Sequence, residues 1–461
     1  MTVDENVPLL RPVDPHEAIY ARFTRSQKTR IVALVSFAGL LPLFVSGSFL
    51  PSIPQIVKDL DSTAQVISLA VSLSVLTNAT GCLLWASYSS FYGRKPIYIA
   101  SLICQCLGSL GVASSRSVPE LLVFRVVQAL GASSGWSIGV AVIGDIYKVE
   151  ERGTASGIFF GAVCLGPALA PLVGGFAAEY YSWRIMQLGL LACGILMLAI
   201  VLTYLPETMH PGARGVDKLE DKDKTKLVLL NPFRSLNVLR SPNILLVCLG
   251  GGLALMTNFA LLVPIAYTMG KRYHIDNAAI LGSLFIPSGV GNILGASFAG
   301  RLSDIALIRG RASRGGILLP EDRLKVARLG ACLMVPMSML GAGLFTTFVD
   351  GNLGIALNLC CLFINGLGVD FVLSPAAAYN IDILHSRSAE VAAATMAMRG
   401  LMIASCTSII LPLINTQGLL ISYIIMALCC WIGSIGLCVV VRHGDRLRAW
   451  NDIGFSTAQV Y

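Results

Sequence analysis

Charged residues are scarce in this sequence. Asp, Glu, Lys and Arg make up 13% of its 461 residues, whereas they make up about a quarter of an ordinary soluble domain. Apolar residues make up 55%, more than a soluble fold of this length could bury. They gather in blocks of about 20, the length that a helix needs to cross ~30 Å of hydrocarbon. A large soluble enzyme is therefore disfavoured, and the composition indicates an all-α membrane protein.

Residues for several kinds of chemistry are also missing. The sequence has no phosphate-binding loop, which excludes ATP-driven transport. All five His lie outside the apolar blocks. The thirteen Cys lie within or beside these blocks without a CxxC pair, so they are predicted to be small buried apolar side chains. No enzyme activity, cofactor or metal ion is expected. The first thirty residues lack the apolar core of a signal peptide, so the first apolar block is expected to target the chain to its membrane.

Twelve membrane spans are predicted, in two groups of six. They cover residues 31–50, 65–86, 97–115, 121–146, 157–178 and 185–205 in the first group, and 244–269, 277–299, 329–349, 353–375, 391–413 and 419–441 in the second. The segment between the groups carries a run of Asp, Glu and Lys that no hydrocarbon core accepts. The expected organisation is a tail (1–30), a six-helix bundle (31–205), a linker (206–243), a second six-helix bundle (244–441) and a second tail (442–461).

The Lys and Arg residues predict the orientation of the chain. Of the 34 residues, 27 lie in alternate segments that include both tails and the linker, 5 lie in the loops between them, and two lie within spans. Basic residues stay on the cytoplasmic side, so both termini are expected to be cytoplasmic. Because the basic residues follow this alternation, the net charge of +8 does not indicate a nucleic-acid partner.

Short elements in the first group of spans match family motifs. Residues 161–175, GAVCLGPALAPLVGG, fit the pattern G-x-x-x-x-G-P-x-x-x-P-x-x-G-G. Residues 85–96, WASYSSFYGRKP, are similar to the loop pattern G-x-L-a-D-r-x-G-R-K-P, and residues 125–131 resemble R-x-x-Q-G with Ala129 in place of its Gly. The sequence LPSIP at 50–54 ends the first span. With these motifs the chain resembles the major facilitator superfamily, and within it the fungal twelve-spanner family of drug:proton antiporters.

This resemblance implies two pseudo-symmetric six-helix bundles that expose a central cavity to each side of the membrane in turn. In the 161–175 segment, glycines let a neighbouring helix approach, and prolines break backbone hydrogen bonds so that the helix can bend. The predicted gating residues are Gly161, Gly166, Pro167, Pro171, Gly174 and Gly175. Static packing is the alternative, because Gly and Pro are common in spanning helices.

The resemblance also implies a charge cluster that latches the cytoplasmic side. Its residues here are Gly93 and Arg94 in the loop, Asp145 at the inner end of the fourth span and Asp304 after the eighth. The chain departs from the family at Ser90, which stands where the loop pattern has its acid. Only part of the cluster is therefore expected to form.

Three charged residues lie deep within predicted spans: Arg125, Arg399 and Asp370. A guanidinium at membrane depth costs several kcal/mol unless it meets water or a partner, so both Arg are expected to face a central cavity, with structural ties to backbone carbonyls as the alternative. The resemblance gives Arg125 an influence on proton transfer. Asp370 is a candidate proton carrier or a fixed partner of Arg399, because burial disfavours its charge and a guanidinium favours it. The other residues expected to line the cavity, or else to bridge helices, are Trp136, Asn258 and Asn365.

These features favour a secondary transporter that exports a small organic molecule in exchange for a proton. Two deep positive charges against one negative charge favour an organic acid, a di- or tricarboxylate metabolite, as substrate. Efflux of drugs, secondary metabolites or toxins is the alternative, because it is common in the family. A transporter-derived sensor is a third possibility, disfavoured because the tails and linker leave no room for a signalling domain.

The partners and location follow from the same reading. The chain is expected to act as a monomer with a small-molecule substrate, protons and membrane lipid as its partners. The plasma membrane is the expected location. Residues 5–10, ENVPLL, resemble an acidic dileucine sorting signal, which makes the vacuolar membrane the alternative.

Cysteine labelling tests the predicted orientation. Cysteines introduced at Ser62 and Asp350 should react with a membrane-impermeant thiol reagent on intact cells, while those at Asp221 and Ser313 should react only after permeabilisation. The unsubstituted chain provides the background from its own cysteines. Labelling of position 221 from outside would contradict the arrangement of six spans on each side of a cytoplasmic linker.

Overall fold

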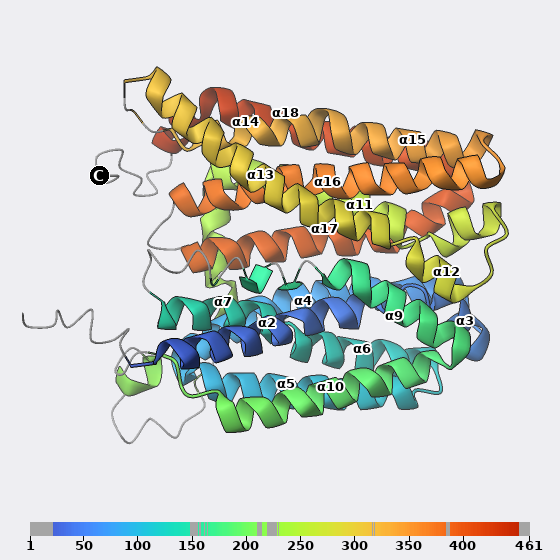
Figure 1. Cartoon of the computed structure of the whole chain (residues 1–461), viewed down its shortest axis with the longest axis horizontal. Coiled ribbons are helices and arrows are strands. Elements are labelled where there is room, and N and C mark those ends of the chain that lie inside the picture. Colours follow the sequence, from blue (N-terminus) through green and yellow to red (C-terminus); the bar gives the residue numbers. More distant parts are fainter. Residues whose placement is uncertain are drawn as a thin grey trace, which may run out of the picture.

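The computed structural model describes residues 22–147, 155, 158–160, 162–163, 165–209, 214–218, 228, 230–315, 317, 319–383 and 388–450. All regular secondary structure in these residues is helical. The long helices lie side by side, with successive helices running in opposite directions (Figure 1). This arrangement satisfies the backbone hydrogen bonds within each helix, which hydrocarbon requires.

The first half of the chain supplies the helices at the blue and green end of the sequence in Figure 1. The spanning helices and their short companion are α2 (Arg25–Gly47), α3 (Ile53–Asp59), α4 (Ala64–Tyr92), α5 (Arg94–Ser114), α6 (Val118–Ala132), α7 (Ser134–Ile146), α9 (Gly166–Tyr180) and α10 (Trp183–Tyr204). Together α6 and α7 form one apolar span, Val118–Ile146. The start of α2 has a capping box, in which Thr24 and Gln27 bond each other's backbone N–H.

The second half follows two short helices of the linker, η1 (Gly215–Lys218) and η2 (Pro232–Arg240). Its elements are α11 (Pro242–Leu262), η3 (Ala266–Gly270), α12 (Ala278–Ser283), α13 (Ile286–Ser313), α14 (Glu321–Leu329), η4 (Gly330–Met334), α15 (Val335–Phe348), α16 (Gly351–Ile383), α17 (Ser388–Gln417) and α18 (Leu419–Trp450). Three of its spans consist of successive pieces: α11 with η3, α12 with α13, and α14 with η4 and α15.

Eleven helices of the described residues are long and apolar enough to cross a membrane. The remaining predicted span, 157–178, corresponds to α9, whose preceding residues lie largely outside the described part of the chain. The prediction of an all-α membrane fold is confirmed. Several helices are longer than the predicted spans, because charged turns continue the helix beyond the apolar window. In this way α13 continues to Ser313, and α14 begins at Glu321.

Large apolar side chains cover the outside of the bundle. Leu107, Val123 and Ile432, for example, are each at least 60% exposed. A water-soluble monomer rarely exposes contiguous apolar surface of this kind, whereas lipid accepts it without cost. The chain is a multi-pass membrane protein.

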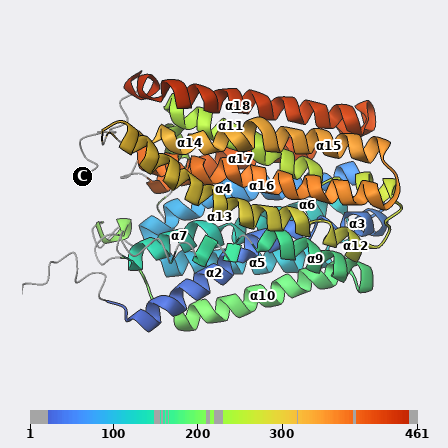
Figure 2. The same ribbon diagram turned by 45° about the horizontal axis from the view of Figure 1, so that its top comes forward.

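In the described part of the chain, the two halves meet mainly at two places. Helix α4 packs along α17, and α9 packs against α12 and α13, as both views show (Figures 1 and 2). A 2.8 Å hydrogen bond joins the hydroxyls of Ser72 and Thr407 across the first pair. At Gly400 a Cβ atom would overlap that of Ala79, so glycine permits this close approach.

The bundle has two distinct ends. We call the end that carries α3 and the start of α12 the α12 end, and the opposite end, with the loops at Gly93 and Arg314, the Gly93 end. The α12 end lies at the right of Figure 1. The described parts of the segments predicted to be cytoplasmic lie at the Gly93 end (Figure 1).

Candidate functional site

Arg125 is fully buried within the first half. Its Nη1 donates to the carbonyl oxygen of Val45, at 3.0 Å, and to Oε1 of Gln128, at 2.8 Å. Its guanidinium carbon lies 4.3 Å from the ring centroid of Phe49, a cation–π contact. Nε and Nη2 have no hydrogen-bond partner among the described residues. Arg125 is therefore held by α2 and its own helix α6, with two donors left over.

Gln128 connects this arginine to two further helices. Its Nε2 donates to Ser109 Oγ on α5, at 2.9 Å, and to Gln187 Oε1 on α10, at 2.8 Å. At Gly108 on α5, a Cβ atom would overlap the backbone of Gln128, so glycine lets the two helices come together. Ser109 and Gln187 were not predicted as site residues from the sequence. A glutamine such as Gln187 within an apolar span needs a hydrogen-bond partner there, and this could have indicated it.

Arg399 and Asp370 form the second deep charge site, between α16 and α17. Arg399 is 6% exposed, and its Nε and Nη2 have no hydrogen-bond partner among the described residues. Asp370 is partly exposed and near enough to interact electrostatically with Arg399, but no ion pair joins the two in the described part of the chain. At Gly251 on α11, a Cβ atom would lie 3.1 Å from Nη2 of Arg399. The absence of a side chain there leaves space for the guanidinium.

Asn258 and Asn365 join four helices of the second half. Asn258 Nδ2 donates to Ser288 Oγ, at 2.9 Å, and to Asn365 Oδ1, at 3.2 Å. Asn365 Nδ2 donates to Thr257 Oγ1 and Ser338 Oγ, both at 3.2 Å. Both asparagines are buried. These bonds favour the bridging alternative over direct contact with a substrate.

Trp136, the other residue predicted to line the cavity, lies on α7. Its side chain is half-buried. Its ring centroid lies 6.1 Å from that of Phe160, with the planes inclined by 60°. The ring thus packs against the segment that precedes α9.

The predicted gating motif lies on α9 and faces both halves. Gly161 falls outside the described residues, and the described members are Gly166, Pro167, Pro171, Gly174 and Gly175. Pro167 lies in the first turn of α9, where its missing N–H removes no bond, whereas Pro171 lies inside the helix. Only Pro171 therefore removes a helical hydrogen bond.

Two of these glycines contact α2 in the same half. A Cβ at Gly166 would lie 2.6 Å from Cβ of Leu43. At Gly174 it would lie 2.6 Å from Cα of Ser48. Neither position has room for a side chain, so the pairing of α9 with α2 depends on glycine.

Gly175 instead contacts the other half. A Cβ there would overlap the carbonyl oxygen of Ala278 and lie 3.0 Å from Cα of Gly282. Further along the same contact, a Cβ at Gly289 would lie 2.7 Å from Cα of Ala168. The backbones of α9, α12 and α13 thus touch through small residues near the α12 end. This contact closes that end of the interface.

A hydrogen bond between described residues crosses the contact of α9 with α12. Oε2 of Glu179, near the end of α9, accepts from the backbone N–H of Ala278 at 2.7 Å. Ala278 is the first residue of α12, where N–H groups lack helical partners. Separation of the halves at the α12 end must break this bond.

The loop at the Gly93 end contains part of the predicted latch. Arg94 forms a bidentate ion pair with Asp145, with Nε–Oδ2 at 2.9 Å and Nη2–Oδ1 at 3.3 Å. Nη1 donates to the hydroxyls of Ser89, at 3.0 Å, and Ser90, at 3.4 Å. Thr208 also donates to Asp145, at 3.2 Å. The serine that replaces the family's acid therefore still accepts a bond from Arg94.

Glu207 is a part of this cluster that sequence reasoning missed. Its two carboxylate oxygens accept from the backbone N–H groups of Arg94, at 3.0 Å, and Lys95, at 3.2 Å. These are the first two residues of α5, so the carboxylate satisfies unpaired donors at the positive end of the helix. Gly93 makes the preceding turn with φ of 109°, which favours glycine.

Asp304 has a partner in its own half. It pairs with Arg323 on α14, and the same guanidinium donates from Nε to Asp382 Oδ2 on α16, at 2.6 Å. Close by, Arg314 pairs with Asp322, and this hydrogen bond raises the pKa of Arg314 above its ordinary value. The second half therefore has its own charge cluster at the Gly93 end.

Glu321 extends this cluster to the last helix. It pairs with Arg448, which also pairs with Asp445, both on α18. The hydroxyl of Tyr379 on α16 donates to Glu321 Oε1 at 3.3 Å. Helices α14, α16 and α18 are thus tied at one point. None of these four residues was selected from the sequence.

The sequence resembles those of known membrane transporters. The sequence profile of the Major Facilitator Superfamily matches residues 35–407. Citrate exporter 1 of Aspergillus niger is 34% identical over 198 residues, which are 43% of this chain and 38% of that protein. Efflux pump FUB11 of Gibberella moniliformis is 30% identical over 402 residues, which cover 82% of this chain and 66% of that protein.

A solved structure has the same fold. The crystal structure of a bacterial homologue of the human lysosomal transporter Spinster superposes with a TM-score of 0.67 at 15% identity. The superposition covers 92% of this chain and 99% of the other. The arrangement of helices is therefore shared at low sequence identity.

A larger side chain at position 175 tests the contact between α9 and α12. In Gly175→Leu, the side chain overlaps the backbone of α12, and overpacking of this kind costs about 1–3 kcal/mol. The arrangement in which α9 contacts α12 should become roughly ten- to a hundredfold less populated, relative to an arrangement in which the two helices are apart. Transport by purified protein in vesicles should fall accordingly, with normal amounts of protein in the membrane.

Gly189→Leu is the matched control. No atom lies within 4 Å of the position that its Cβ would take. It adds the same side chain to a spanning helix and should leave transport unchanged. Equal transport rates for Gly175→Leu and Gly189→Leu would contradict the prediction, because the Gly175 contact would then be static packing without a role in transport.

Proposed function

The chain belongs to the major facilitator superfamily, and from that premise we propose that it exports a small organic anion in exchange for a proton. A di- or tricarboxylate metabolite is the favoured substrate. Members of the family are membrane transporters and not enzymes, so this chain is a transporter of small molecules. What we propose beyond this is the direction of transport, its coupling to protons and the class of the substrate.

Arg399 is the observation that carries the proposed substrate class. It is buried in the interior of the second half with two nitrogen atoms unpaired among the described residues. A buried guanidinium without a full set of acceptors is costly. A carboxylate substrate supplies those acceptors and can bind in bidentate fashion. Arg125 differs, because Val45 and Gln128 already engage one of its nitrogens within the first half. We infer that Arg125 influences proton transfer, as its motif implies.

Asp370 supports the coupling to protons. It is a partly exposed carboxylate without an ion-pair partner in the described part of the chain, within electrostatic range of Arg399. The charge of Asp370 alters the electrostatic field at Arg399, and an anion bound at Arg399 alters the field at Asp370. Binding of substrate and proton are thereby linked through one pair of residues.

The contacts between the halves support alternating access. The glycine contacts of α9 with α12 and α13 close the α12 end. The distribution of Lys and Arg supports an outer position for this end, with both termini cytoplasmic. The structure then corresponds to a state closed to the outside, and export requires these contacts to separate. All of these elements lie in one chain, so the proposed transport needs only a monomer. The proposed location is the plasma membrane, with the vacuolar membrane as the alternative.

Two relatives agree with export, and the name of one of them gives a substrate. The named substrate of Citrate exporter 1 is a tricarboxylate, which agrees with a site built on Arg399, although that alignment covers less than half of either protein. Efflux pump FUB11 aligns over 82% of this chain, and its name agrees with export without naming a substrate. The second candidate is efflux of secondary metabolites or drugs. The charge of the substrate distinguishes an organic acid from a cationic drug.

Three variants test the sign of the substrate. If the substrate is a carboxylate, Arg399→Lys should weaken its binding, because Lys supplies a point charge in place of a bidentate contact, and Arg399→Ala should weaken it further. Loss of a charged hydrogen bond costs about 1.5–3 kcal/mol, so affinity should fall roughly ten- to a hundredfold in Arg399→Ala. Asp370→Asn should retain most of the affinity but alter the pH dependence of exchange.

Substrate affinity is measured for the three variants in the same vesicles. Arg116→Ala, which removes an equal charge from an exposed position, is the control. A cationic substrate predicts the reverse order, since Asp370→Asn removes the negative charge that would attract it. A loss of affinity confined to Asp370→Asn would overturn the organic-anion proposal.

A further inference from the structure

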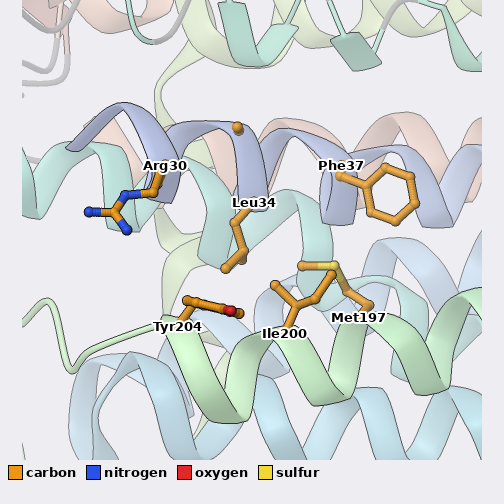
Figure 3. A pocket seen from close by; sticks show the side chains of 7 residues that line it. Arg30, Leu34, Phe37, Met197, Ile200 and Tyr204 are labelled. Atoms are coloured by element: carbon orange, nitrogen blue, oxygen red, sulfur yellow. The ribbon is translucent and has the colours of Figure 1, made fainter. Parts of the chain in front are cut away.

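A groove on the outside of the first half lies between α2 and α10, at the Gly93 end. Its volume is about 350 Å³, and Ala33, Leu34 and Phe37 of α2 line it together with residues of α10. In Figure 3, Leu34 points from α2 toward α10, and Met197 and Ile200 point back toward α2. The walls of the groove are therefore almost entirely apolar.

One end of the groove is charged and polar. Arg30 and Tyr204 lie at this end, and Phe37 lies at the opposite end (Figure 3). Arg30 is exposed and has no ion-pair partner among the described residues. It lies in the second turn of α2, and Tyr204 is the last residue of α10, so both lie where spanning helices leave the hydrocarbon. Tyrosine and arginine are typical of this interfacial level.

Basic residues gather on α2 at this end of the groove. Helix α2 has no acidic residue in its first turn, and Arg25 and Lys28 precede Arg30 within two turns. Lys28 lies 5.2 Å from the ring centroid of Tyr147, and no salt bridge to Lys28 or Arg25 occurs in the described part of the chain. A groove with a cationic mouth and an apolar floor is complementary to a molecule with an anionic head and a hydrocarbon tail.

We propose that this groove binds one anionic glycerophospholipid from the surrounding leaflet. Its phosphate lies at Arg30, and the hydroxyl of Tyr204 is placed to donate to the same headgroup. One acyl chain follows Leu34 and Ile200 toward Phe37. The site faces the membrane and is separate from the interior around Arg399.

The second half has a groove of similar form at the same end, with a weaker charge. It lies between α13 and α14, has a volume of about 330 Å³, and includes Arg309 and Lys325. Lys325 is already paired with Asp322, at 2.7 Å. The attraction for an anion is partly neutralised there, so the groove at Arg30 is the stronger site.

Photocrosslinking of the full chain in lipid bilayers tests the proposal. The probe is a phosphatidylserine with a photoreactive group in its acyl chain, and a phosphatidylcholine with the same chain is the zwitterionic comparison. Crosslinked peptides are mapped by mass spectrometry. At limiting probe, phosphatidylserine should label peptides that contain residues 33–37 and 197–204 more strongly than phosphatidylcholine does.

Two variants separate the contribution of the headgroup from that of the tail. Arg30→Gln should reduce labelling by phosphatidylserine about fivefold, the contribution of one basic residue near an anionic surface, without changing labelling by phosphatidylcholine. Ala33→Trp fills the groove from an exposed position and should reduce labelling by both lipids. Lys58→Gln removes an equal charge at the α12 end and should change neither.

Two results would overturn the proposal. One is equal labelling of these peptides by the two lipids in the unsubstituted chain. The other is labelling by phosphatidylserine that Arg30→Gln and Ala33→Trp both leave unchanged. Neither result depends on whether the chain transports an organic anion.

Discussion

The cost of an unpaired polar group in hydrocarbon is the constraint on which this structure depends. It requires helices, because a helix satisfies its own backbone, and it requires every deep charge to lie between helices. Arg125 meets part of the requirement with a carbonyl, a glutamine and an aromatic ring of its own half, although its Nε and Nη2 have no partner among the described residues. Arg399 leaves the same two nitrogens unpaired and has no bonded acceptor comparable to Val45 or Gln128 in the described part of the chain. The proposed function follows from this difference, since a carboxylate substrate completes what the protein leaves open.

Transport adds a second requirement, that the two halves pack closely and still separate. Interdigitated large side chains would make such a contact costly to break, because interiors lose their dispersion contacts when they part. Here the backbones of α9 and α12 touch through Gly175 and Gly282, and one hydrogen bond from Ala278 to Glu179 crosses the contact. At the Gly93 end, by contrast, ion pairs such as Arg94–Asp145 hold each half together within itself. At the Gly93 end, the ion pairs Arg94–Asp145 and Arg448–Glu321 lie within halves, whereas small residues such as Gly175 and Gly282 form the contact between halves near the α12 end.

The sequence was sufficient for the fold class, because hydrocarbon thickness fixes the length of a spanning helix and so of each apolar block. Gly166, Gly174 and Gly175 of the motif lie at close helix contacts, and their role in gating stays a prediction. The sequence was insufficient for contacts between distant segments. Glu207 lies 113 residues from Arg94, and Arg448 lies 127 residues from Glu321. No local sequence pattern therefore predicts either contact. These acids lie on turns outside the apolar windows, where span prediction has no information. The hydrogen bonds of Asn258 and Asn365 also depend on which face of each helix points into the bundle. The sequence does not indicate this face, because these helices are apolar on nearly all sides.

Exchange of a tricarboxylate for protons is the most direct test of this account. Purified protein is reconstituted in vesicles with an acidic lumen, and uptake of a labelled tricarboxylate is followed beside that of a cationic dye, with and without a protonophore. The account predicts that the tricarboxylate accumulates as protons leave, against the direction in which a weak acid distributes passively, and that the protonophore abolishes this accumulation. Proton-driven accumulation of the dye, with no movement of the tricarboxylate, would contradict it.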